Sequence, residues 1–389
     1  MKLLHTSDWH VGKTLRGRAR LDEQRDVLRQ IVRIARDEAV DAVLVAGDLW
    51  DSATPSAEAQ SLVVRSLLAM RDSGAHVVAI AGNHDHPGSL DAWRPLAGVA
   101  GITLVGTVRD AEHGGVVQLT SRDGAERLNV AVLPFLSQRY AVRAAQLVAA
   151  TPAENSGSYD QMVRDVLASL AAGFTDDAVN VVMAHLTVTG GQLGGGEREA
   201  QSIFEYYVPA TAFPATAHYV ALGHLHRRQT LPAPTQVVYS GAPLAVDFGE
   251  QDNTPVVCLV EATPTTPARV TDVPITAARR LRTATGTVAE LTARAEEFGE
   301  DYLRLIVREA ARPGLREDLT DALPNALEIR IDPEFAAPLH AGRASIERIG
   351  RSPGELFAEY CASHGVTDER VQKLFAELHD ELTTAEPLA

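Results

Sequence analysis

Five short groups of histidine, aspartate and asparagine residues carry side chains of the kinds that bind divalent metal ions. They are Asp8 with His10, Asp48 with Asp51, Asn83 to Asp85, His185, and His224 with His226. Imidazole nitrogens, carboxylate oxygens and an amide oxygen, without a thiolate, suit ions such as Mn²⁺, Fe²⁺ or Zn²⁺. These groups hold more candidate ligands than one ion can bind. They fit two neighbouring ions that share a carboxylate and together clamp a phosphate.

Taken alone, each group is a weak indication, because an Asp-x-His pair or a single histidine is common in proteins that bind no metal. Their shared position is more informative. Each group follows a short apolar run that predicts a β-strand, at residues 3–6, 42–46, 77–81, 179–184 and 218–222. Ligand sites of layered α/β proteins gather where strands end, so the five groups together predict one site.

Other elements complete an α/β pattern in the first 262 residues. We expect helices at 21–39, from 55 to 73 and at 159–172, a hairpin of strands 116–120 and 128–133, and strands 237–240 and 256–260. Thr54 before Pro55 predicts the N-cap of the second helix. The alternation of strands with helices predicts a layered α/β core.

The composition limits the class of protein. The chain has 389 residues, 45% of them hydrophobic, which predicts two or three packed units and excludes a mainly disordered chain. Two distant cysteines, Cys258 and Cys361, predict neither a disulfide framework nor a thiolate zinc site. No apolar run is long enough to cross a membrane, so we expect a cytoplasmic protein with no membrane partner. The formal net charge of −15 argues weakly against nucleic acid as a binding partner. Local basic strips or bound cations can nevertheless reverse the electrostatic field at a binding site.

The character of the sequence changes after residue 262. The stretch Thr263 to Pro267 reads as a turn or linker, and residues 277–338 fit a second, smaller α/β unit. Ser352-Pro353-Gly354-Glu355 predicts a capping box that opens two amphipathic helices over residues 352–384. These helices can pack on the protein's own core or dock on a partner, and the preceding linker-like stretch favours docking.

The five groups follow the signature order of one superfamily. Asp8-x-His10, Gly47-Asp48-x-x-Asp51, Gly82-Asn83-His84-Asp85, His185 and Gly223-His224-x-His226 resemble the calcineurin-like metallophosphoesterases. Within that superfamily the segments 3–12, 46–51, 81–85, 219–226 and 239–244 are similar to the SbcD family of bacterial nuclease subunits. The resemblance implies a four-layer β-sandwich flanked by helices, a DNA-capping domain at 277–338 and C-terminal helices that dock on an SbcC-type ATPase.

The same resemblance implies a role for each residue of the motifs. Two divalent ions, with Mn²⁺ preferred and Fe²⁺ or Zn²⁺ as alternatives, would be held by Asp8, His10 and His226, by Asn83, His185 and His224, and by Asp48 between them. His84 would protonate the departing sugar oxygen, and Asp85 would orient its ring. Asp51 remains open between positioning the substrate and stabilising its loop. His86 is also open, because it stands where relatives differ.

Contacts with DNA and with a partner are further expectations. The basic residues near the first and last motifs can read phosphates or can be solvated surface charges; they are Lys13, Arg16, Arg18, Arg20, Arg227 and Arg228. The apolar residues expected to dock on the partner are Leu356, Phe357, Val371, Leu374, Phe375 and Leu378. No nucleotide-binding motif follows the glycines of 190–196, so any ATP use falls to the partner.

The resemblance implies Mn²⁺-dependent hydrolysis of DNA phosphodiesters by a homodimer, with exonuclease action on duplex ends and endonuclease action on hairpins or single strands. Two alternatives remain. One is a small-molecule phosphodiesterase or phosphatase with the same metals, although the roughly 150 residues after the last motif argue against it. The other is a metal-free scaffold without activity, against which the complete ligand set argues.

Overall fold

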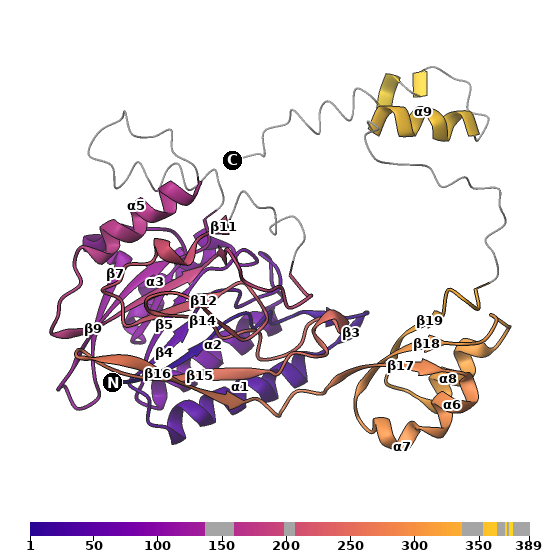
Figure 1. Cartoon of the computed structure of the whole chain (residues 1–389), viewed down its shortest axis with the longest axis horizontal. Coiled ribbons are helices and arrows are strands. Elements are labelled where there is room, and N and C mark those ends of the chain that lie inside the picture. Colours follow the sequence, from indigo (N-terminus) through magenta and orange to yellow (C-terminus); the bar gives the residue numbers. More distant parts are fainter. Residues whose placement is uncertain (137–158, 198–206, 337–352, 364–369, 372, 376–389) are drawn as a thin grey trace. The chain divides into compact units, whose positions relative to one another are not determined.

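The computed structural model describes residues 1–136, 159–197, 207–336, 353–363, 370–371 and 373–375 (Figure 1). The chain divides into two compact units, Met1–Phe335 and Ala336–Ala389.

The first six-stranded sheet carries three of the five motif groups. Its strands, in spatial order, are β16 (Thr266–Pro274), β15 (Val256–Thr263), β1 (Lys2–Thr6), β4 (Ala42–Val45), β5 (His76–Ile80) and β6 (Ile102–Val105). Strands β1, β4, β5 and β6 are parallel, and β15 and β16 are antiparallel additions at one side. The carboxyl ends of β1, β4 and β5 therefore lie along one edge.

The second six-stranded sheet carries the other two groups. Its strands, in spatial order, are β13 (Gln229–Leu231), β14 (Gln236–Tyr239), β12 (Tyr219–Gly223), β9 (Ala178–His185), β8 (Arg127–Leu133) and β7 (Val116–Thr120). Strand β7 pairs with β8 in antiparallel orientation at the sheet's edge, which confirms the predicted hairpin. Strand β9 lies parallel to both β8 and β12. The carboxyl ends of β9 and β12 thus also share an edge.

The two sheets pack face to face between two layers of helices. Apolar side chains from both sheets, among them Leu44 and Met183, fill the space between the sheets. The opposite face of the first sheet packs on α1 (Leu21–Asp37), α2 (Ala57–Asp72) and α3 (Pro87–Val99). The opposite face of the second sheet packs on α5 (Tyr159–Ala171). Figure 1 shows α1 and α5 on opposite sides of the sheets. Strands buried on both faces explain the continuous apolar runs. The four-layer α/β fold is confirmed.

One strand is missed and one local prediction is wrong. The stretch after residue 262 forms the turn between β15 and β16, which is one of its two predicted readings, but β16 itself is absent from the predicted strands. Strand β16 lies at the sheet's edge, where proline is tolerated, so its Thr-Pro composition resembles that of a loop. Helix α2 is capped by Ser56 rather than Thr54: the Ser56 hydroxyl accepts a hydrogen bond from the Ala59 N–H at 3.2 Å.

A three-stranded parallel sheet follows the core within the first unit. Its elements are β17 (Leu281–Gly286), α6 (Val288–Ala293), α7 (Ala295–Phe298), β18 (Tyr302–Val307), α8 (Leu315–Ala322) and β19 (Ala326–Ile331). This small sheet has its own apolar cluster around Leu291, Leu305 and Leu319. A short hairpin, β2 (Thr14–Leu15) with β3 (Arg18–Ala19), places Leu15 against Phe248 and Tyr302 and so contacts the small sheet.

In the second unit the structure describes α9 (Pro353–Ser363) and helical residues 370–371 and 373–375. The rings of Phe357 and Phe375 stack with centroids 4.0 Å apart. The side chains of Leu374 and Val371 are exposed. Leu356 lies in α9, while Leu378 and the predicted N-cap Ser352 lie outside the described residues.

Substitution of a side chain between the two sheets should destabilise the core. Leu44→Ala removes a fully buried side chain and should lower the free energy of unfolding by about 2–5 kcal/mol, since a cavity remains. Denaturant unfolding of both proteins measures the difference. Leu193→Ala, at a half-exposed position, should change stability by less than about 1 kcal/mol. Equal losses in the two variants would contradict the assigned core.

Candidate metal centre

Loops from both sheets meet at one place. Asp8, Asp48 and Asn83 follow β1, β4 and β5, and His185 and His224 come at the ends of β9 and β12. The sheets are connected there by a hydrogen bond of 2.8 Å between His185 Nδ1 and the carbonyl oxygen of Ala46. The carboxyl edges of the two sheets therefore bring the five motif groups together.

The backbone of these loops is strained. Six non-glycine residues of the described chain have positive φ, and four of them are candidate ligands: Asp8, His10, Asp48 and His224. Such conformations cost about 1–3 kcal/mol each and persist where surrounding contacts hold them. Gly82 is required for a related reason: a Cβ there would lie 2.1 Å from Asp48 Oδ1. Surrounding contacts therefore hold these loops in backbone conformations that are unfavourable on their own.

One half of the cluster consists of Asp8, His10 and His226. One ligand atom of each lies within 4.8 Å of the others, and the Nε2 atoms of His10 and His226 are 3.0 Å apart. Asp8 is held through both oxygens: Oδ2 accepts a hydrogen bond of 2.5 Å from the Ser7 hydroxyl, and Oδ1 accepts the His224 N–H at 3.0 Å.

The other half consists of Asn83, His185 and His224. The amide oxygen of Asn83 lies 2.9 Å from His185 Nε2 and 2.9 Å from His224 Nδ1. Three donor atoms of the type predicted for the second ion thus converge on one point.

Asp48 lies between the two halves. Its Oδ2 atom is 3.6 Å from His10 Nε2 and 3.5 Å from His185 Nε2. Its Oδ1 atom accepts a hydrogen bond of 2.8 Å from the His84 N–H. This carboxylate oxygen thus lies between candidate ligands of both halves, as a ligand shared by two ions must. The structure brings all seven predicted ligands into one cluster, in which Asn83 is half-buried and the other six are buried.

The position of the His226 ring depends on acidic residues that sequence reasoning missed. Glu250 is only 1% exposed. Its Oε1 atom lies 2.5 Å from His226 Nδ1, and its Oε2 atom accepts a hydrogen bond of 2.7 Å from the Val246 N–H. Glu197 accepts the His226 N–H at 2.9 Å. A metal-binding histidine commonly gives its second N–H to a carboxylate. Glu250 stands in no motif, and the polar residues and glycine beside it in the sequence do not mark it as special.

The predicted role of Asp85 does not fit the structure. Its two carboxylate oxygens accept backbone hydrogen bonds from Gly82, Leu49 and Trp50 at 2.9–3.2 Å, so it ties two loops together. His84 Nδ1 instead lies 2.8 Å from the carbonyl oxygen of Asp51. Asp51 also pairs with Lys13 at 3.0 Å. The residue that orients the His84 ring is therefore Asp51.

Electrostatics of the cluster favour bound cations. Burial raises the pKa of Asp8 to about 6 and raises the pKa of Asp48 as well, because their charges are removed from water. Burial lowers the pKa of His10 and of His185, so these rings are neutral and able to bind metal. Burial alone would lower the pKa of His226, but the Glu250 charge and hydrogen bond raise it to about 10.

The donor set fits two divalent ions. Asp8 and Asp48 are buried and form no ion pair with a lysine or arginine among the described residues, and ions between the carboxylates would supply compensating charge. His84 also lies within 4.8 Å of His10 and Asp48, so its ring borders the same space. The cluster is a candidate dimetal site.

The arginines predicted to read DNA have protein partners. Arg20 is 3% exposed, bonds Glu23 at 2.7 Å and packs over the Tyr302 ring, so it supports the small sheet and does not reach a phosphate. Arg16 pairs with Glu328 and with Asp247, both at 2.9 Å.

The remaining arginines predicted to contact DNA differ in their surroundings. Arg228 pairs with Asp272 at 2.8 Å and Arg227 bonds Gln192 at 2.8 Å. Arg18 is exposed on the short hairpin. These residues lie on segments that directly follow the first and last metal motifs.

The fold and site match a known class of enzyme. A family model described as calcineurin-like phosphoesterase matches residues 1–228, the part of the chain that contains all five groups. Members of that class are metal-dependent hydrolases of phosphate esters.

Relatives narrow the family further. The SbcD subunit of the nuclease SbcCD from Bacillus subtilis is 36% identical over 97% of each chain. Its counterparts in Rhodobacter capsulatus and Escherichia coli K12 are 36% and 27% identical, covering 64% and 77% of this chain and 64% and 74% of their own. The chain belongs to the SbcD family of calcineurin-like phosphoesterases.

Substitution of Glu250 should weaken metal binding without removing a ligand. Glu250→Gln deprives His226 Nδ1 of its charged partner, and loss of such a partner commonly lowers metal affinity about 10- to 100-fold. Titration calorimetry with Mn²⁺ measures the effect. Asp48→Asn, which alters the residue between both halves, should lose more affinity than Glu250→Gln. Wild-type affinity in Glu250→Gln would contradict the role assigned to this carboxylate.

Proposed function

We propose that this chain is the nuclease subunit of an SbcC–SbcD complex that hydrolyses DNA phosphodiesters during repair, recombination and replication. The observation that carries the proposal is Asp48 Oδ2, 3.6 Å from His10 and 3.5 Å from His185, at the meeting of two three-residue ligand sets. We propose exonuclease action on duplex ends and endonuclease action on hairpins or single strands. The names of the relatives support this activity.

We propose Mn²⁺ as the resident ion, with Fe²⁺ or Zn²⁺ as substitutes. Asp8, His10 and His226 would hold one ion, and Asn83, His185 and His224 the other, with Asp48 between them. When bound, two such ions activate a water and neutralise the charge of the phosphate. The mixed oxygen and nitrogen donors support this choice.

We assign proton transfer at the leaving group to His84. The Asp51 carbonyl accepts the Nδ1–H, which fixes the tautomer and leaves proton exchange to Nε2. The ring lies within 4.8 Å of ligand atoms of His10 and Asp48, close enough to a bound phosphate to serve a departing sugar oxygen. Asp51 acts as the positioning residue.

We propose that residues 277–338 cap the DNA and that helices within 352–384 dock on an SbcC-type ATPase. The contact of Tyr302 and Glu328 with the hairpin that follows the first metal motif supports the capping role. Exposed Leu374 and Val371 beside the stacked Phe357 and Phe375 support docking, because exposed apolar groups indicate an interaction surface.

We also propose a homodimer and a cytoplasmic location. Leu96 and Val99 of α3 are 77% and 90% exposed, an apolar surface that a second copy could cover.

The cytoplasm is where the proposed substrate is found. No helix in the described part of the chain is long and apolar enough to span a membrane.

His84→Ala should separate chemistry from metal binding. We expect cleavage of linear duplex DNA with Mn²⁺ to fall by about 10²–10⁴-fold, because the leaving group loses its proton donor. The Mn²⁺ content, measured by elemental analysis, should stay at the wild-type value. A parallel loss of metal and activity would contradict this role. Robust wild-type turnover of cyclic nucleotides without DNA cleavage would instead make the chain a small-molecule phosphodiesterase.

Removal of residues 352–389 should separate nuclease activity from complex formation. The truncated chain keeps the entire metal cluster, so Mn²⁺-dependent cleavage of linear duplex should remain within about twofold of the full chain. Association with the SbcC-type ATPase, measured by size-exclusion chromatography of the mixed proteins, should be lost. Co-elution of the truncated chain with the ATPase would overturn the docking assignment.

A further inference from the structure

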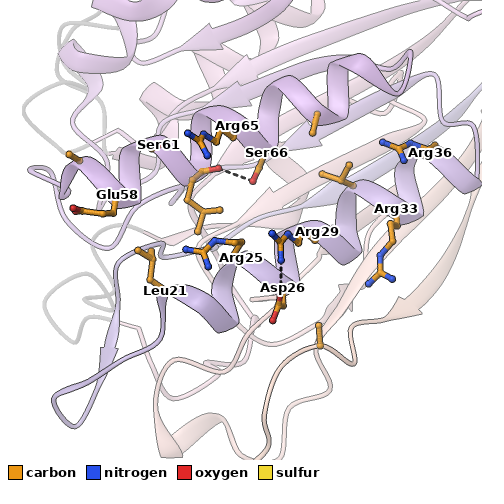
Figure 2. A pocket seen from close by; sticks show the side chains of 15 residues that line it. Leu21, Arg25, Asp26, Arg29, Arg33, Arg36, Glu58, Ser61, Arg65 and Ser66 are labelled. Carbon is orange, nitrogen blue, oxygen red and sulfur yellow. Dashed lines mark hydrogen bonds and ion pairs between the residues drawn. The ribbon is translucent and has the colours of Figure 1, made fainter.

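A basic groove lies between α1 and α2, on the outer face of the first sheet. Its volume is about 950 Å³. Arginines line both of its walls, four from α1 and one from α2: Arg25, Arg29, Arg33, Arg36 and Arg65. Figure 2 shows these side chains rising from the two neighbouring helices. Two carboxylates, Asp26 and Glu58, also line the groove, so positive charge dominates in a chain of net charge −15.

The arginines are paired to different degrees. Arg25 pairs with Asp22, and Arg29 pairs with Asp26 at 3.1 Å. Arg33, Arg36 and Arg65 are exposed and form no ion pair with the residues that the structure describes. Three guanidinium groups are therefore available to an external anion.

The spacing of the arginines suits a repeating anion. Arg25, Arg29 and Arg33 are four residues apart, which places their Cα atoms about 6 Å apart along the axis of α1. A guanidinium binds phosphate oxygens through two parallel N–H bonds, a geometry that lysine lacks. A single small anion would occupy one such position, whereas a chain of phosphates can occupy several.

The helices that form the groove are connected to loops of the metal centre. Helix α1 follows the loop of Asp8 and His10, and Gln24 of α1 bonds the His10 carbonyl oxygen at 3.0 Å. Helix α2 follows the loop that contains Asp48 and Asp51. Because both helices run back along the sheet from these loops, the groove leads away from the metal centre.

We propose that this groove binds the phosphate backbone of nucleic acid, as a contact outside the metal centre. The choice of nucleic acid over an acidic protein segment rests on the proposed nuclease function and on the helical spacing of the arginines. A duplex that enters the metal centre is charged along its whole length, so a second basic surface increases affinity without reading sequence.

The test compares two double variants of the full chain. Arg36→Ala with Arg65→Ala removes one unpaired arginine from each wall, and alanine is well tolerated in helices. Arg127→Ala with Arg269→Ala removes the same charge from exposed positions outside the groove. Fluorescence anisotropy of a labelled linear duplex in EDTA, at several salt concentrations, measures binding in the absence of cleavage.

The groove variant should bind the duplex about 10-fold more weakly, and its salt dependence should fall by about two units in the slope of log K against log salt. The control should match the wild type. Equal binding by both variants would overturn the groove assignment even if the wild type cleaves DNA. Unchanged DNA binding with lost association to the ATPase would overturn it too, and would assign the groove to a protein partner. A wild type that binds duplex but cannot cleave it would refute the nuclease function and leave the groove standing.

Discussion

The site depends on one buried carboxylate at the meeting of two sheets. Asp48 receives the His84 N–H on one oxygen and faces His10 and His185 with the other. A carboxylate that is removed from water and faces neutral imidazoles is unfavourable, and its raised pKa expresses that cost. Cations between the ligands would relieve it. The unfavourable electrostatics of the cluster without ions would therefore favour the binding of metal ions.

The layered scaffold makes this arrangement possible. Positive φ angles at Asp8, His10, Asp48 and His224 would relax in an isolated loop. Here each loop is anchored by a buried strand whose side chains pack on both faces, and Asp85 secures two of the loops through three backbone N–H groups. Strain at the site is thus balanced by burial elsewhere, which is why the ligands need neither disulfide nor local helix to hold them.

Sequence reasoning finds the candidate ligands of this site more readily than the residues that support them. Ligands stand in short motifs at strand ends, and the carboxyl ends of parallel strands meet, so their convergence follows from local patterns. Glu250 and Asp51 act across tertiary contacts, which no local spacing encodes. Asp85 shows the converse error: adjacency to His84 suggests a partner for the ring, but its carboxylate faces the backbone of another loop. Strand β16 escapes prediction because edge strands tolerate proline and polar residues.

The arginines show the same contrast. Those close to a metal motif in the sequence are not always the ones left free to bind an external anion. Arg16 and Arg20 follow the first metal motif directly, yet Glu328, Asp247 and Glu23 neutralise them where the hairpin meets the small sheet. Their interactions hold that sheet beside the core. The arginines of α1 lie further from any motif, but helical spacing keeps them on one face, and Arg33 and Arg36 form no ion pair with the described residues. An overall negative charge is compatible with a polyanionic substrate when the arginines near the motifs serve the fold and those along a helix face solvent.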